Sequence, residues 1–232
     1  MYTLNRCENA ATAAQYLSEQ VANALNRVLQ TQERATLAVS GGRSPIAFFQ
    51  ALSQTDLAWE RVNITLVDER IVPTTHADSN TQLVRQYLLQ NQAAEATWLP
   101  MIDDAADECR LQDTQAAVDF ALQHHQPADV VVLGMGGDGH TASLFPQAPQ
   151  FANGIRADYP QPLLHTTPVT APHERISMTL AAIERSSAQF LAIAGAEKMA
   201  VLEQAKQQVQ TALPISYVLH SEQTQLNIVY HD

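Results

Sequence analysis

Residues 134–145 read GMGGDGHTASLF, and they place a histidine and a carboxylate in a glycine-rich turn. His140 is the side-chain type best suited to general-base chemistry near neutral pH, and Asp138 stands two residues before it. Glycines let a backbone bend sharply and approach a ligand closely. The preceding segment DVVVL, at 129–133, is typical of a buried strand. This setting predicts that His140 is a catalytic base, and that Asp138 either orients it or simply forms the turn.

The same glycines match the G-x-G-x-x-G pattern of dinucleotide-binding proteins, which is a weak signal when it stands alone. That fold needs a full crossover helix after the last glycine, and then a strand with an acidic residue about 20 positions on. Asp158 lies at that distance, but Pro146 comes six residues after His140, and FANGIRADY is not a strand pattern. We therefore interpret the glycines as presenting His140 rather than as binding a nucleotide.

Alternating strand and helix patterns must position this turn. A polar loop is predicted at 68–80 and a Pro-rich irregular region at 146–172, and Ser44 is expected to cap the helix that starts at Pro45. The alternation predicts an α/β fold: a single Rossmann-like domain over 1–232, with a mostly parallel sheet and helices on both faces. The expected strands are 36–40, 62–67, 129–133, 174–180, 189–194 and 226–230, and the expected helices are 12–30, 45–52, 81–90, 105–124, 181–187 and 196–208.

Polar segments follow four of these strands. SGGRS at 40–44 comes after the first strand, DER at 68–70 after the second, GMGGDGH after the third, and GAEK at 195–198 after the QFLAIA strand. Ligands bind beyond the carboxyl ends of the strands in such sheets. The four segments are therefore predicted to form one site.

Net charge and cysteine content exclude several classes of function. The chain carries a formal net charge of −11 with only 13 Lys and Arg, which argues against nucleic acid as a partner. A small anionic substrate is still compatible, because a few local cations outweigh a screened distant background. Cys7 and Cys109 form no C-x-x-C pair, and the ligand spacing of common metal motifs is missing, so two free thiols and no metal are expected.

The N-terminal segment and the apolar runs of the chain indicate its cellular location. The first residues, MYTLNRCENAATAAQYL, lack a basic start followed by an apolar run, and the apolar runs are too short to span a bilayer. We expect a cytoplasmic protein without a membrane partner, as a monomer or a small homo-oligomer.

The segments SGGRSP, LVDERIVP…DSN and DVVVLGMGGDGHTASLFP together closely resemble the 6-phosphogluconolactonase family, which is related to glucosamine-6-phosphate isomerase/deaminase. HERISMTL and IAGAEK fit the same pattern, and DGHTASL is the most diagnostic piece. The resemblance runs in order from about residue 35 to about 205. One departure is Ser44, where threonine is common in the family; the hydroxyl is kept.

The resemblance implies hydrolysis of 6-phospho-D-glucono-1,5-lactone to 6-phosphogluconate, without a metal or cofactor. The family's catalytic histidine falls on His140, and its substrate-contacting acid and base fall on Asp68 and Arg70. The phosphate-binding elements of the relatives fall on the turn that begins at Ser40, with Gly41, Gly42, Arg43 and Ser44, and on Arg175 and Lys198.

Chemistry supports these assignments to different degrees. A sugar phosphate carries close to two negative charges, which a helix N-terminus and fixed cations can hold. Lys198 is expected in the first turn of a helix, where a cation is unfavourable unless an anion faces it. Arg175 points away from Ile176 on an alternating strand, either to solvent or into the site. The oxyanion of a tetrahedral intermediate is expected to meet N–H groups of the glycine turn, such as that of Gly136, or Arg70.

Two other functions compete with the lactonase. A glucosamine-6-phosphate isomerase or deaminase needs a further acid/base near the histidine, and related isomerases have glutamate five residues after it. Here that position is Phe145, which cannot transfer a proton. A non-catalytic sugar-phosphate sensor would need an output module, for which the α/β pattern leaves no room.

Overall fold

The fold is taken from a computed structural model, which describes residues 1–42, 44–223 and 225–232. Its main sheet has the strand order β1-β10-β9-β6-β2-β3-β5, and every neighbouring pair is parallel. The strands are β1 (Tyr2–Arg6), β2 (Ala35–Val39), β3 (Val62–Leu66), β5 (Thr97–Trp98), β6 (Val130–Leu133), β9 (Ala188–Ala194) and β10 (Leu226–His231). The central strands β2, β3 and β6 are buried along their whole length, as expected when both faces of a parallel sheet are covered.

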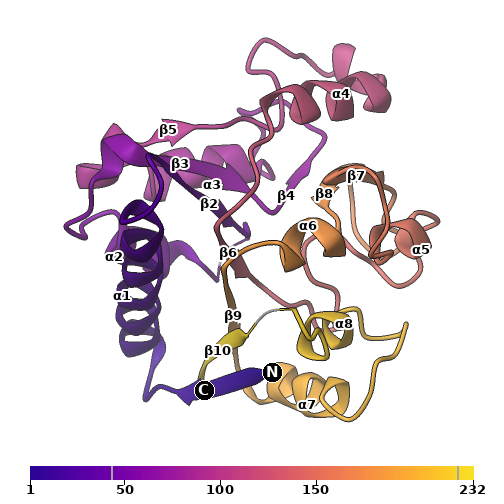
Figure 1. Ribbon diagram of the computed structural model, residues 1–232. Helices are drawn as coiled ribbons and strands as arrows, with labels where there is room; N and C mark the ends of the chain where they lie inside the picture. The colour runs from indigo at the N-terminus through magenta and orange to yellow at the C-terminus, as the bar shows by residue number, and fades with distance from the viewer. Residues whose placement is uncertain (43, 224) are drawn as a thin grey trace.

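Helices cover both faces of this sheet. Figure 1 shows α1 and α2 on one side of the strands, and α6, α7 and α8 on the other. The predicted α/β class with a mostly parallel sheet is thereby confirmed. The helices are α1 (Ala10–Leu29), α2 (Ile46–Leu52), α3 (Asn80–Tyr87), α4 (Thr114–His124), α5 (Phe151–Gly154), α6 (Leu180–Glu184), α7 (Ala196–Ala205) and α8 (Ile215–Leu219).

Helix α1 illustrates how local sequence sets the fold. Asn9 and Thr12 form a reciprocal capping box: the Asn9 side chain accepts the Thr12 N–H at 3.0 Å, and the Thr12 hydroxyl accepts the Asn9 N–H at 3.1 Å. The stripe of Leu17, Val21, Leu25 and Val28 is buried in the core, as the helical spacing predicts.

A second sheet was not predicted. It has the antiparallel order β4-β8-β7, with β4 (Asp68–Arg70), β7 (Leu163–Thr166) and β8 (Arg175–Met178). The prediction of a loop at 68–70 and of wholly irregular structure at 146–172 is therefore wrong. Three polar residues cannot show the alternation of apolar and polar side chains that marks a strand, so the sequence does not predict β4. The segment is a strand because it pairs with β8.

Other local features also differ from the prediction. Helix α4 begins at Thr114 rather than near 105, because the Asp113 side chain caps it by accepting the Ala116 N–H at 3.0 Å. The residue at the cap of α2 is Pro45, and no side-chain hydrogen bond is made there, so Ser44 is not its cap. Residues 141–150 form turns and an isolated bridge between Thr141 and Leu144. The short elements β1, β5 and α8 had no predicted counterpart.

Both termini lie at one edge of the main sheet, where β1 pairs with β10 (Figure 1). None of the helices in the described parts of the chain combines the length and hydrophobicity needed to cross a membrane.

Candidate active site

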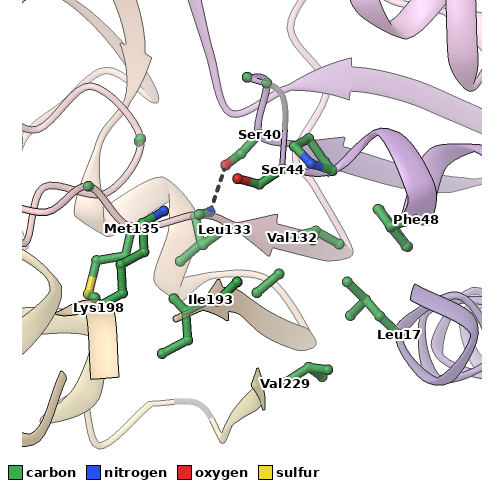
Figure 2. A pocket seen from close by; sticks show the side chains of 18 of the residues that line it. Leu17, Ser40, Ser44, Phe48, Val132, Leu133, Met135, Ile193, Lys198 and Val229 are labelled. Atoms are coloured by element: carbon green, nitrogen blue, oxygen red, sulfur yellow. Dashed lines mark hydrogen bonds between the residues drawn. The ribbon is translucent and has the colours of Figure 1, made fainter. Parts of the chain in front are cut away.

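A cavity of about 300 Å³ opens at the carboxyl ends of β2, β6 and β9. Its size lies at the lower end of the range of small-molecule sites, which is about 300–1,000 Å³. The cavity brings together residues from all four polar segments: Ser40, Gly41, Gly42, Ser44, Asp68, Arg70, Gly136, His140 and Lys198, with Arg175 from β8. Figure 2 shows Ser40, Ser44 and Lys198 around it, together with the apolar side chains of Leu17, Phe48, Ile193 and Val229.

The glycine turn after β6 is tied to its surroundings by hydrogen bonds. The Gly134 N–H donates to Ser40 Oγ at 3.1 Å, which is the dashed line in Figure 2. The Gly136 N–H donates to the His140 carbonyl at 2.9 Å, which closes the turn. Gly139 has a φ of +75°, in the left-handed region that favours glycine. The turn therefore fixes the backbone from which His140 projects.

His140 and Asp138 form a hydrogen-bonded pair at the cavity wall. His140 Nδ1 lies 2.5 Å from Asp138 Oδ1, and that oxygen also accepts the His140 backbone N–H at 3.2 Å. The hydrogen bond with His140 lowers the pKa of Asp138, so the carboxylate stays ionised and accepts the Nδ1 proton. The Nε2 lone pair is then the one left for a substrate or a water molecule.

Gly136 allows this pair to form. A Cβ added at residue 136 would lie 2.2 Å from His140 Nδ1 and 2.6 Å from Asp138 Oδ1, well inside van der Waals contact. Any side chain here must therefore displace the imidazole, the carboxylate or both.

We expect Gly136→Ala to lower kcat for the catalysed reaction by about 10²-fold, the typical cost of a misplacement of about 1 Å. Gly137→Ala is the matched control, because a Cβ there would meet nothing within 4 Å. Steady-state kinetics of both variants, with circular dichroism to confirm folding, test this. Equal kcat in the two variants would contradict the proposed role of the close approach.

Phe145 and Arg175 complete the surroundings of the imidazole. The Phe145 ring stacks on the His140 ring with centroids 4.2 Å apart and an interplanar angle of 28°. On the Phe145 ring lies Arg175, whose guanidinium carbon is 5.3 Å from the centroid. Phe145, at the position where related isomerases have glutamate, therefore packs between His140 and Arg175.

Arg175 is buried and points into the cavity, which resolves the alternative that the sequence left open. Asp68 Oδ2 lies 3.8 Å from Arg175 Nη1 and accepts the Ser143 hydroxyl at 2.5 Å. Burial lowers the pKa of Arg175, and the nearby Asp68 opposes that effect. Asp68 therefore pairs with Arg175, and it also lines the cavity in which the resemblance implies a substrate-contacting acid.

Arg70 is held by a backbone carbonyl rather than by Asp68. Its Nη1 donates to the Asp78 carbonyl at 2.5 Å, and its side chain lines the cavity. The Nε atoms of Arg70 and Arg175 are both buried and have no hydrogen-bond partner within the described residues. Two guanidinium groups with unused donors therefore lie at the cavity, which is a suitable arrangement for an anionic or oxygen-rich ligand.

Lys198 is the third residue of α7, as predicted, and is half-buried. Burial lowers the pKa of its ammonium group. Within the described residues no carboxylate forms an ion pair with it, whereas Lys206 on the same segment pairs with Glu203 at 2.7 Å. A partly desolvated cation at the start of a helix, facing a cavity, is the setting of an anion site.

The turn after β2 also approaches its neighbours closely. A Cβ at residue 41 would lie 1.9 Å from Asn80 Oδ1, and Gly42 has a φ of +88°. Ser44 lies on the cavity. Arg43, which the resemblance assigned to phosphate binding, lies outside the described residues.

Glu69 is an important residue that sequence reasoning missed. Its side chain is fully buried and accepts the backbone N–H groups of Arg70, Asn80 and Thr81 at 2.7–2.8 Å, and two hydroxyl groups as well. Burial raises its pKa, and the hydrogen bonds from Asn80 and Thr81 oppose that rise. The carboxylate thus fastens the start of α3 to β4, between Asp68 and Arg70 of the site. The sequence gives little indication of this role, because Glu69 is one charged residue in a segment predicted to be a polar loop.

Replacing Glu69 with alanine is expected to lower the free energy of unfolding by at least about 3 kcal/mol, since each orphaned buried donor costs about 1–3 kcal/mol. Urea denaturation measures this. The control is Glu95→Ala, an exposed residue whose loss should change stability by no more than about 0.5 kcal/mol. Similar losses in the two variants would show that the buried network does not stabilise the fold.

The sequence and the fold of this chain are similar to those of known proteins. Residues 8–227 match the family described as glucosamine-6-phosphate isomerases/6-phosphogluconolactonase, and the chain belongs to that family. Among its relatives is a 6-phosphogluconolactonase of Neisseria meningitidis serogroup A, 56% identical over 230 residues that cover 99% of each chain. Another is the 6-phosphogluconolactonase of Helicobacter pylori strain 26695, 40% identical and covering 99% of this chain and 98% of the relative.

A solved structure extends the likeness to three dimensions. The crystal structure of a 6-phosphogluconolactonase from Shewanella baltica OS155 superposes with a TM-score of 0.89 at 33% identity, covering 100% of this chain and 98% of that one. The family resemblance that the motifs indicated is thus confirmed across the whole chain.

Proposed function

We propose that this chain hydrolyses 6-phospho-D-glucono-1,5-lactone to 6-phosphogluconate, with His140 as the general base. The observation that carries the proposal is that one cavity is lined both by His140, which is hydrogen-bonded to Asp138, and by Lys198, a half-buried cation without a carboxylate partner in the described residues. The names of relatives 56% and 40% identical over nearly the whole chain support the choice of substrate.

The phosphate is expected at the Lys198 side of the cavity. A phosphate monoester carries about 1.5–2 negative charges near pH 7, so a desolvated ammonium group gains a strong charge-assisted partner there. Hydroxyl and backbone groups of Ser40, Gly42 and Ser44 line the same cavity and offer further donors. The guanidinium of Arg175 contacts the Asp68 carboxylate and the Phe145 ring. Its Nε has no partner among the described residues and offers one more donor, from the side of the second sheet.

The lactone carbonyl then lies toward His140. Nε2 of the neutral imidazole takes a proton from water as the water oxygen bonds to C1, and the carbonyl oxygen becomes an oxyanion. The Arg70 guanidinium or N–H groups of the glycine turn stabilise that oxyanion, but not the Gly136 N–H expected from the sequence, because it already donates to the His140 carbonyl. The C1–O5 bond then breaks, and O5 receives the proton from the imidazolium, which leaves a carboxylic acid and the ring-opened hydroxyl. The carboxylic acid releases its proton to solvent, which gives the carboxylate of the product. Asp138 stabilises the transient imidazolium through its bond to Nδ1.

The isomerase alternative has less support. Moving a proton between carbons needs a second acid/base close to the histidine, and Phe145 fills that place with a stacked ring. No observation favours the sensor alternative, since a binding protein has no need of an ionised carboxylate held against a histidine.

A coupled assay tests the proposal. Glucose-6-phosphate dehydrogenase generates fresh lactone, and acid release is followed with and without this protein, while a parallel reaction with glucosamine 6-phosphate is assayed for ammonia. We expect acid release well above the spontaneous background and no ammonia. Ammonia release would support the isomerase/deaminase instead, and tight binding without any turnover would support the sensor.

A further inference from the structure

A second cluster of titratable side chains lies beside the cavity. His173 Nε2 is 2.9 Å from Asp78 Oδ2, and His76 Nδ1 is 3.9 Å from the same oxygen. One ligand atom from each of the three residues lies within 4.8 Å of the other two. None of the three residues lines the cavity of the proposed active site.

The fold brings these residues together from distant parts of the sequence. His76 and Asp78 lie between β4 and α3, whereas His173 lies just before β8. Strands β4 and β8 pair with Arg70 opposite Arg175, and the Ile71 N–H donates to the Glu174 carbonyl at 2.8 Å. His173 adopts a φ of +68°, a left-handed conformation uncommon outside glycine. No sequence spacing revealed the cluster, because about a hundred residues separate its two histidines.

We propose that His76, Asp78 and His173 form a binding site for a divalent transition-metal ion such as Zn²⁺, separate from the catalytic cavity. Two imidazoles and one carboxylate suit Zn²⁺, Ni²⁺ and Cu²⁺, and water fills the remaining positions of such a site. A single carboxylate provides too few oxygen ligands for a Ca²⁺ or Mg²⁺ site built by the protein.

The exposure of the three side chains suits this role. The side chains of His76, Asp78 and His173 are 37%, 53% and 26% exposed, which gives an ion access from solvent. Arg70 donates to the backbone carbonyl of Asp78, so this bond does not occupy the carboxylate.

Metal binding requires a small rearrangement. With bonds of about 2.0–2.1 Å, tetrahedral ligand atoms lie about 3.3 Å apart. Because the present ligand atoms lie within 4.8 Å of one another, no pair must close by more than about 1.5 Å. The metal replaces two hydrogen bonds, that of His173 with Asp78 and that of the Asp78 N–H with His76 Nδ1 at 3.1 Å. Both are made at partly exposed side chains, where water competes with them.

Equilibrium dialysis of the full-length protein against Zn²⁺, with metal analysis of both sides, tests the proposal. We expect one equivalent of bound zinc. We also expect His173→Ala to lower the affinity for zinc by about 10–100-fold or more, because mutating even a residue that only hydrogen-bonds to a metal ligand lowers metal affinity by that factor. His76→Ala and Asp78→Asn should weaken binding likewise, and circular dichroism establishes that each variant is folded. Substitution with Co²⁺ should give a visible spectrum without thiolate charge-transfer bands.

Control variants separate this site from other ligands. Binding should be unchanged in His124→Ala, an exposed histidine at the end of α4, and in His140→Ala, which removes the catalytic imidazole. The proposal is overturned if the wild-type protein binds no zinc. It is also overturned if His173→Ala binds zinc as tightly as the wild type, or if the ion is lost in His140→Ala instead.

Discussion

Replacing His140 with alanine is expected to lower the turnover of 6-phospho-D-glucono-1,5-lactone by about 10²–10⁴-fold, the usual contribution of a general base. The imidazole is the only group in the account that takes the proton from the attacking water. Its loss leaves the phosphate contacts proposed for Lys198 in place. The coupled assay, corrected for spontaneous hydrolysis, measures the effect.

The binding of 6-phosphogluconate provides the internal control for this variant. Because the phosphate-holding groups are intact, the product should bind His140→Ala within a few-fold of the wild type, as measured by calorimetry. His124→Ala removes an exposed histidine away from the cavity and should keep the full rate. Wild-type turnover in His140→Ala would refute the assignment of the base.

Replacing Lys198 with alanine is expected to raise KM for the lactone by about 10–100-fold while changing kcat much less. A charge-assisted hydrogen bond contributes about 1.5–3 kcal/mol, and 1.4 kcal/mol corresponds to a factor of ten. Lys206→Ala is the matched control, since these two residues are the chain's only lysines and Lys206 is already paired with Glu203.

A comparison of ligands shows whether Lys198 acts through the phosphate. In the wild type, 6-phosphogluconate should bind far more tightly than gluconate, which lacks the phosphate. In Lys198→Ala most of that preference should vanish, because the affinity for gluconate does not depend on the ammonium group. An unchanged preference for the phosphorylated ligand would place the phosphate elsewhere.

The charge of the whole protein and that of the site have opposite signs. The chain has a formal net charge of −11, yet Arg70, Arg175 and Lys198 all line one cavity. Counterions screen the distant carboxylates beyond about 8–10 Å, so the potential that a substrate meets is set by these local cations. We expect added salt to weaken substrate binding, because salt also screens the attraction between these cations and the phosphate.

Strong local patterns made the central features of the fold predictable. The buried strand 129–133, the glycine turn and the helix carrying Lys198 each have a clear signal, and the rule that parallel strands place their carboxyl ends together predicted their meeting point. The glycines also work as expected, because Gly136 leaves room for the imidazole. These inferences needed only neighbouring residues and a general rule of sheet geometry.

The second sheet and its contacts could not be predicted in this way. Strand β4 is three polar residues long, and it is a strand only because β8, a hundred residues later, pairs with it. The pairing of Asp68 with Arg175 and the burial of Glu69 both depend on that antiparallel contact. Interactions over such a distance leave no periodic trace in a single sequence.

A crystal structure of the protein with 6-phosphogluconate tests the central claim most directly, because it measures both ends of the ligand at once. We expect a phosphate oxygen within hydrogen-bond distance of Lys198 Nζ, and a carboxylate oxygen about 2.6–3.2 Å from His140 Nε2. A phosphate bound beside His140 with the carboxylate near Lys198, or a ligand held outside the cavity, would contradict it.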